Sequence, residues 1–225
     1  MIHVLLFMQH TLSEENYLKA IYRLSQKSDE KITPTAIAET LGNNAASVVD
    51  MIRKLTEKGL IDYNKKTGVK LVDEGLKHAV LIVRKHRLWE VFLLDKLGYH
   101  WDEIHEIAED LEHISDSTFA DRLDKFLGFP EYDPHGDPIP KADGKLPKTY
   151  SVTLANVKVG ETYKVAAVKD TSSSFLQYLV KLNIGIGTKI KLVEKIDFDQ
   201  SLVISINGGK QTTVSPKFGE NILIY

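Results

Sequence analysis

The spacing of apolar residues changes once along this 225-residue chain, and that change limits the folds it can adopt. Up to about residue 128, apolar side chains recur mainly every three or four positions, which predicts amphipathic helices. From residue 150 onward they alternate in short runs separated by glycine, which predicts the strands of a small β-barrel. The polar linker at residues 141–149 separates the two patterns. We therefore expect an α+β multidomain protein.

Residues 11–75 are typical of a winged helix-turn-helix. A helix at 12–26, with Ser13 as its expected N-cap, precedes a short helix at 33–42 and a longer one at 45–59. Two alternating strands at 60–63 and 69–72, joined by a polar loop with a glycine, predict a hairpin. The helix-turn-helix pattern alone leaves an ordinary helical hairpin open, but the following wing favours a DNA-binding domain.

Two groups of residues in this domain are candidates for contacting DNA. The stretch 53–70 carries six basic and two acidic residues, which suits phosphate. We expect Lys54 and the wing residues Lys65, Lys66 and Lys70 to face the DNA backbone. The candidates for reading base edges are the polar residues that open the longer helix: Asn43, Asn44, Ser47 and Asp50.

Residues 84–114 combine histidine and carboxylate side chains at helical spacing on two segments separated by Gly98. His86 and Glu90 lie four positions apart, and so share one helix face. In the second segment His105, Glu109, Glu112 and His113 fall within an arc of roughly 100°, apart from the apolar positions. A solvated face would be the usual explanation for one such helix. Two of them, with donors that suit divalent first-row metals, favour a metal site, to which Asp133 and His135 in a Pro- and Gly-rich turn can add ligands.

The helix that carries His86 is apolar on more than one face, which indicates a partner beyond its own domain. Winged-helix proteins generally read two half-sites as dimers, so we assign residues 76–140 to dimerisation and metal binding. Residues 76–136 carry 7 basic and 13 acidic side chains, a balance that suits cations. The chain has no cysteine, which excludes disulfides and thiolate metal sites. The apolar run at residues 2–8 is too short to span a bilayer and lacks signal-peptide features, so we expect a cytoplasmic protein that does not contact the membrane.

With these motifs in place, the sequence resembles the diphtheria toxin repressor family of metal-dependent transcriptional repressors. The resemblance covers roughly residues 12–140, and its most specific pieces are NYLKAIY (16–22), RKHRL (84–88), LEHISD (111–116) and HGDPIP (135–140). Residues 150–225 look like the SH3-like barrel of that family, also seen in ferrous-iron transport protein A, with GIGTKI (185–190) as the matching segment.

The resemblance implies two metal sites. The primary site would use His86, Glu109, Glu112, His113 and Asn16. Relatives usually have Asp or Met at the position of Asn16, and the neighbouring Glu15 is an alternative ligand. The second site would use Glu90, Asp133, His135 and Asp170 of the barrel, with His105 belonging to the iron-type version of that site.

The ligand set also indicates the metal. Iron-sensing members have Cys at the position of Glu109, whereas this set contains only oxygen and imidazole donors, which favours Mn2+. By the Irving–Williams order, Fe2+ and Zn2+ can still bind more tightly in vitro. The resemblance therefore implies a non-enzymatic, homodimeric repressor that binds operator DNA and controls metal-ion homeostasis genes in response to Mn2+.

Several alternatives stay open at this point. The first is an Fe2+-dependent repressor of the same family, and the second is a metal-independent winged-helix regulator. A metallohydrolase would leave the winged helix unexplained, and the chain lacks an H-E-x-x-H motif. An iron-uptake accessory protein, suggested by the barrel, would not explain the first 140 residues.

Overall fold

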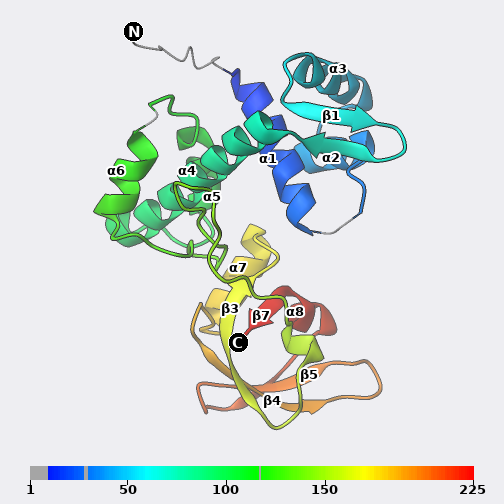
Figure 1. The fold of residues 1–225 in the computed structure, drawn as a ribbon. Coiled ribbons are helices and arrows are strands. Elements are labelled where there is room, and N and C mark those ends of the chain that lie inside the picture. The colour runs from blue at the N-terminus through cyan, green and yellow to red at the C-terminus, as the bar shows by residue number, and fades with distance from the viewer. Residues whose placement is uncertain (1–9, 28–29, 117) are drawn as a thin grey trace. The chain divides into compact units, whose positions relative to one another are not determined.

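The computed structural model describes residues 10–27, 30–116 and 118–225 (Figure 1). The chain divides into two compact units. The first runs up to His86 and adds Glu109–Leu123 and Pro140–Lys145, while the second comprises Arg87–Ala108, Asp124–Ile139 and Leu146–Tyr225. Each unit is described by itself.

The first unit contains the expected helix-turn-helix and wing. Its elements are α1 (Leu12–Lys27), α2 (Pro34–Leu41), α3 (Ala45–Glu57), β1 (Ile61–Asn64), β2 (Gly68–Leu71) and the first part of α4 (Asp73–Leu97). The antiparallel hairpin pairs Ile61 with Leu71 and closes at Asn64 and Gly68. One apolar core joins these elements, with contributions from Leu18, Ile21, Ile37, Val48, Ile52, Leu55, Val69 and Val83. The predicted winged helix is thus confirmed.

Local side-chain chemistry explains where these helices begin. Thr33 accepts a hydrogen bond from the Ala36 N–H at the start of α2, and Asn44 accepts one from the Ser47 N–H at the start of α3. The expected cap of α1 was wrong. Instead of Ser13, the Thr11 hydroxyl accepts from the Glu14 N–H, and the Glu14 carboxylate accepts from the Thr11 N–H at 2.9 Å. This reciprocal pair is a capping box.

The helices that follow differ in length from the expectation. Helix α4 is 25 residues long, and its first part supplies Ala79 and Val83 to the core of the first unit. Because the units divide within α4, the domain predicted for residues 76–140 is shared between them. Helix α5 (Ile104–Leu111) ends before Glu112, although helical spacing was expected up to residue 114, and α6 spans Phe119–Phe126.

The second unit contains a small antiparallel β domain. Its elements are η1 (Leu154–Asn156), β3 (Thr162–Val168), α7 (Ser173–Lys181), β4 (Lys189–Lys195), β5 (Leu202–Ile206), β6 (Gln211–Val214), α8 (Pro216–Asn221) and β7 (Ile222–Ile224). The strand order is β6-β5-β4-β3-β7, and β3 pairs with β4 through its first half and with β7 through its second. The sequence analysis did not predict β6 or α8, because QTTV lacks an apolar alternation and α8 is only six residues long.

Within the described residues, no helix is both long enough and apolar enough to cross a membrane. The apolar run at residues 2–8, which we expected to be neither a membrane span nor a signal peptide, lies outside the described residues.

The first turn of α4 lies unusually close to the strand that begins the wing. A Cβ added to Gly75 would lie 1.9 Å from the Leu60 carbonyl oxygen. We expect Gly75→Ala to destabilise the protein by about 1–3 kcal/mol or more, because the backbone must shift to remove the overlap. Thermal unfolding measures this, with Gly185→Ala as the control, since a Cβ there meets nothing within 4 Å. Equal melting temperatures for the two variants would contradict the close approach.

Candidate metal centre

A buried cluster of imidazole and carboxylate groups lies in the first unit. His86 on α4 and Glu112, just beyond the end of α5, are 2 % and 0 % exposed. His86 Nδ1 lies 2.6 Å from Glu112 Oε2 and 4.0 Å from Glu109 Oε1. One ligand atom from each of these three residues lies within 4.8 Å of the others. The structure therefore brings together three of the five residues predicted for the primary site.

Two basic side chains of α1 face the same carboxylates. Lys19 Nζ lies 2.6 Å from Glu112 Oε1 and 2.7 Å from Glu109 Oε1, and Arg23 Nη1 lies 3.8 Å from Glu109. Burial alone would raise the pKa of Glu109, but Lys19, His86 and Arg23 together hold it below its ordinary value. Both carboxylates are therefore disposed toward cations.

The remaining predicted ligands connect the first turns of α1 to this cluster. His113 Nδ1 lies 2.5 Å from Glu15 Oε2, and His113 Nε2 lies 3.8 Å from Glu112. Within the described residues, the buried Asn16 Oδ1 has no hydrogen-bond partner. Unsatisfied buried acceptors are uncommon in proteins, and a hydrogen-bond donor or a cation would satisfy this oxygen.

These residues fit a divalent cation. The set offers two imidazoles and three carboxylates within a mostly buried cluster, and the Asn16 amide oxygen is a buried acceptor on the helix that also carries Glu15. No sulfur donor is present, and such nitrogen and oxygen sets suit Mn2+, Fe2+ and Zn2+.

A second buried cluster lies in the second unit. Glu90, Asp133 and His135 are all buried, and one ligand atom of each lies within 4.8 Å of the others. Glu90 Oε2 lies 3.5 Å from His135 Nδ1, while Glu90 Oε1 lies 3.0 Å from His105 Nδ1. Four of the five residues predicted for the second site thus lie together.

The loop that carries Asp133 and His135 is fixed by its own turn and by the β domain. Asp133 Oδ1 accepts hydrogen bonds from the N–H groups of His135 and Asp137. The Val168 N–H of β3 donates to the His135 carbonyl, and a Cβ at Gly136 would lie 2.2 Å from the Ala166 carbonyl oxygen. Gly136 also has φ +86°, so both its backbone conformation and its close approach to Ala166 require glycine.

Asp170 is not part of this group. Its Oδ1 accepts the Ser172 N–H at 2.9 Å, at the start of α7. Among the described residues it joins no cluster of ligating atoms. Its role as a ligand stays a prediction.

The buried acids of the second cluster perturb one another. Burial, together with the charge of Glu90, raises the pKa of Asp133 to about 8. Burial alone would lower the pKa of His135, but Glu90 and Asp133 raise it. A cation bound here would relieve the repulsion between the two carboxylates.

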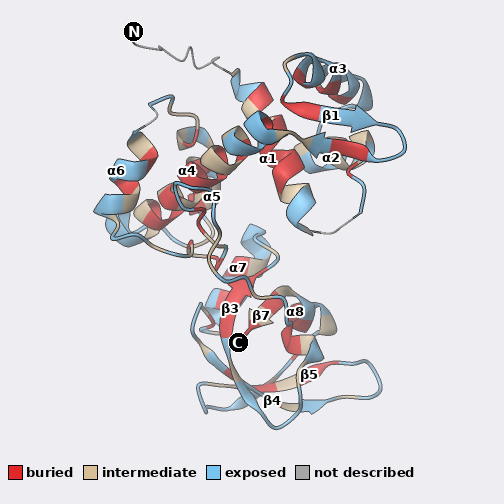
Figure 2. Cartoon of the chain, viewed as in Figure 1, coloured by how far each residue is buried: buried red, intermediate tan, exposed pale blue. Residues whose placement is uncertain are grey.

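The residues predicted to read DNA are exposed. Asn43, Asn44, Ser47 and Asp50 all lie at the surface, at or near the first turn of α3, and Figure 2 shows the outer face of this helix as exposed. The wing residues Lys65, Lys66 and Lys70 are exposed as well. Arg53, which the sequence analysis did not single out, lies on the same helix and pairs with Asp50 at 3.3 Å.

Lys54 has a different environment from the wing lysines. Its Nζ lies 3.1 Å from Oε1 of the buried Glu14, and Lys58 Nζ lies 2.6 Å from the same oxygen. Burial alone would raise the pKa of Glu14, but these lysines and the Thr11 N–H lower it to about 2. The predicted DNA contact of Lys54 stays a prediction, because its ammonium already has an internal partner.

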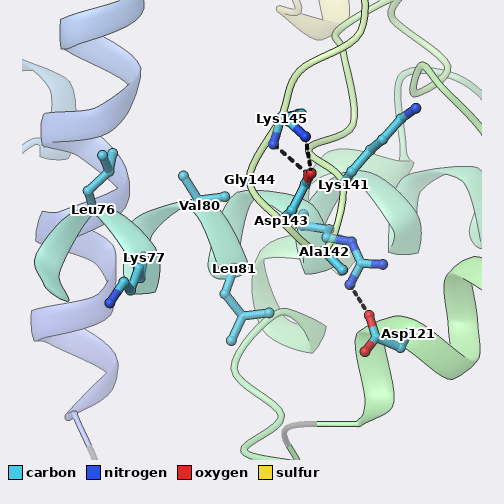
Figure 3. Close-up of a pocket in the computed structure, with 11 residues that line it drawn as sticks. Leu76, Lys77, Val80, Leu81, Asp121, Lys141, Ala142, Asp143, Gly144 and Lys145 are labelled. Atoms are coloured by element: carbon cyan, nitrogen blue, oxygen red, sulfur yellow. Dashed lines mark hydrogen bonds and ion pairs between the residues drawn. The ribbon is translucent and has the colours of Figure 1, made fainter. Parts of the chain in front are cut away.

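A separate groove of about 610 Å³ in the first unit does not resemble a metal site (Figure 3). It lies between α4, Asp121 and the loop Lys141–Lys145, with Leu76, Val80 and Leu81 along one side. Asp121 pairs with Arg84, and Asp143 pairs with Lys145. Each carboxylate of this groove is therefore neutralised by a basic side chain, and no histidine lines it.

Comparison with known protein families agrees with this division of roles. Residues 10–69 match the N-terminal DNA-binding domain of iron-dependent repressors, and residues 72–141 match their metal-binding and dimerisation domain. Residues 152–225 match the FeoA domain.

Individual relatives give the same result. The diphtheria toxin repressor of Corynebacterium diphtheriae is 27% identical over 212 residues, which cover 86% of this chain and 88% of that protein. The iron-dependent repressor IdeR of Mycobacterium tuberculosis is 34% identical over 128 residues. The match covers 56% of this chain and 54%, about half, of IdeR.

Solved structures also match over nearly the whole chain. A manganese-dependent transcriptional repressor in complex with manganese is 35% identical with a TM-score of 0.84, and the match covers 94% of this chain and 98% of that one. The manganese regulator SloR is 38% identical with a TM-score of 0.75, and the match covers 94% and 97%.

The raised pKa of Asp133 predicts a pH-dependent stability difference. A carboxyl group that keeps its proton in the folded state but loses it on unfolding makes the folded state less stable as pH rises between the two pKa values. Without metal, Asp133→Asn should therefore gain stability over the unsubstituted protein between about pH 4 and 8, by at most about 1.4 kcal/mol per pH unit. Thermal unfolding in chelator across this range measures the gain.

Asp95→Asn is the control, because that carboxylate is exposed on α4 and is not among the charges that act on Asp133. A stability gain for Asp133→Asn that does not change with pH would show that Asp133 is ionised throughout the range.

Proposed function

We propose that this chain is a metal-dependent repressor that binds operator DNA as a homodimer. The chain belongs to the diphtheria toxin repressor family of iron- and manganese-dependent regulators. The observation that carries the proposal is the placement of the primary cluster. Its ligands come from α4, from the end of α5 and from α1, and α1 packs within the winged helix of the same unit. It would control genes of metal-ion homeostasis. Its location would be the cytoplasm, where the DNA lies.

The mechanism follows from which elements the ligands join. When bound, a divalent cation supplies the positive charge that carboxylates and imidazoles share. His86 on α4 would be one of its ligands. At the end of α5 the ligands would be Glu109, Glu112 and His113, and on α1 the ligand would be Asn16 or Glu15. Tyr17, Leu18 and Ile21 of α1 pack in the core with α2 and α3, so ligands on α1 also fix the reading helix.

The donor set favours Mn2+ over Fe2+ as the physiological metal. Glu109 supplies an oxygen where iron-sensing relatives have a thiolate, and the chain has no cysteine at all. Relatives described as manganese-dependent cover nearly the whole chain, which also supports Mn2+. An Fe2+-dependent repressor is the second candidate, favoured by the likeness to IdeR. Both candidates predict that metal binding weakens as pH falls, because protons compete for the ligands.

We assign dimerisation to apolar side chains around the end of α4 and the end of α6. Leu97, Phe126 and Phe129 are 57%, 64% and 65% exposed, and Phe126 contacts the Phe92 ring. Covering these side chains with a second copy of the chain would remove their apolar surface from water.

Removing a ligand should abolish the metal response without dissociating the dimer. We expect Glu112→Ala and His113→Ala to weaken Mn2+ binding by roughly 10–100-fold or more and to abolish Mn2+-dependent DNA binding. Calorimetry measures the first effect, gel shift the second and sedimentation the dimer. Asp110→Ala is the control, because Asp110 is exposed at the end of α5, just before Glu112 and His113. Unchanged Mn2+ dependence in both ligand variants would refute the proposed site.

Replacing the wing lysines should weaken binding to all DNA sequences alike. The double substitution Lys65→Gln and Lys66→Gln removes two phosphate contacts from each subunit, four per dimer, so the slope of log affinity against log salt should fall by about 4. Fluorescence anisotropy at several salt concentrations measures the slope. Lys189→Gln with Lys191→Gln, a pair of exposed lysines on β4, is the control. If affinity fell for one DNA sequence only, the wing would be reading bases.

A further inference from the structure

Glu14 is a carboxylate with no exposed surface, in the first turn of α1, and its charged partners lie on another helix. Oε1 faces Lys58 at 2.6 Å and Lys54 at 3.1 Å, both at the C-terminal end of the α3 segment. Oε2 accepts the Thr11 N–H and lies 3.8 Å from His10 Nδ1. Glu14 thus ties the start of α1 to the end of α3.

The residues next to Glu14 belong to the primary metal cluster. Glu15 contacts His113 at 2.5 Å, and Asn16 carries the buried oxygen that has no hydrogen-bond partner among the described residues. Since these three positions are consecutive in one helix, their backbone atoms move together. Any ordering of Glu15 or Asn16 by a bound cation therefore also acts on Glu14.

The partners of Glu14 belong to the helix that carries the base-reading candidates. Asn44 and Ser47 open α3, and Lys54 and Lys58 lie at its other end. Separating Glu14 from these lysines is costly, because it would leave a buried carboxylate without a charged partner. A shift of Glu14 would therefore move α3 as one body, with the ion pairs kept.

We propose that Glu14 is a positioning residue that couples the metal centre to the reading helix through its ion pairs with Lys58 and Lys54. This inference rests on the proposed function, and adds to it the route by which metal binding reaches DNA. Glu14 is not a ligand in this account. It acts only through the orientation of α3.

The capping box gives Glu14 a second, purely structural role, and the experiment must separate the two. A cap stabilises α1 whether or not metal is bound, so losing it would lower DNA affinity equally in both states. Loss of the coupling would instead lower the ratio of DNA affinities measured with and without metal. This ratio is the quantity to measure.

The test compares Glu14→Gln with the unsubstituted full-length protein. Calorimetry gives the affinity for Mn2+, and fluorescence anisotropy gives the affinity for a fragment of the gene's own upstream DNA, in chelator and in saturating Mn2+. If metal raises DNA affinity by the 5- to 150-fold typical of such coupling, Glu14→Gln should reduce that factor about 3- to 10-fold. Its Mn2+ affinity without DNA should stay near that of the unsubstituted protein.

Lys58→Gln provides a second route to the same result, should Glu14→Gln fail to fold. Lys58 is partly exposed, and replacing it leaves the Thr11 capping contact in place. It should reduce the coupling in the same direction but by less than Glu14→Gln, because Lys54 still pairs with Glu14 at 3.1 Å. Adding Lys58→Gln to Glu14→Gln should lose little more, because Glu14→Gln already removes both ion pairs. Glu57→Gln, an exposed carboxylate on α3, is the matched control.

Two outcomes would overturn the proposal. The first is an unchanged ratio in Glu14→Gln, or in Lys58→Gln if Glu14→Gln does not fold. If DNA affinity then falls equally with and without Mn2+, Glu14 acts through capping alone. The second is a ratio of one in the unsubstituted protein, which needs no variant and would overturn the proposed function as well.

Discussion

Glu112 has no exposed surface, and its two carboxylate oxygens face Lys19 and His86 at 2.6 Å each. A buried carboxylate must keep positive or hydrogen-bonding partners, because the cost of removing its charge from water is several kcal/mol. This requirement joins three segments that are far apart in the sequence, namely α1, α4 and the end of α5. It also makes the cluster a place where a divalent cation is favoured.

The same principle recurs in each part of the proposed mechanism. In the second cluster, Glu90 and Asp133 lie close enough for burial and repulsion to raise the pKa of Asp133, which again favours a cation. In the winged helix, Glu14 keeps its charge because Lys54 and Lys58 reach it. In the proposed mechanism, buried carboxylates therefore both hold metal and connect helices. Because α1 takes part in both uses, metal binding and DNA reading have a common element.

Local signals in the sequence were sufficient to predict the winged helix, because Thr33, Pro34, Gly42 and Asn44 each have a known role at a helix end. The spacing of His and carboxylate residues predicted a metal site, whereas the family resemblance predicted which of them gather into each cluster. Sequence could not predict that Lys19 faces Glu112, since the two lie 93 positions apart and only the packing of α1 brings them together. The same holds for Glu14, although the T-x-x-E pattern at residues 11–14 is a capping signal that could have been read.

The central claim is that metal binding controls DNA binding. Its most direct test is the affinity of the unsubstituted protein for a fragment of its gene's upstream DNA, at fixed salt, first in chelator and then with Mn2+, Fe2+ or Zn2+ titrated in. We predict tight binding only with metal, and the effective concentrations would rank the three ions. Equally tight binding in chelator would contradict the account, and would leave a winged-helix regulator without a metal switch.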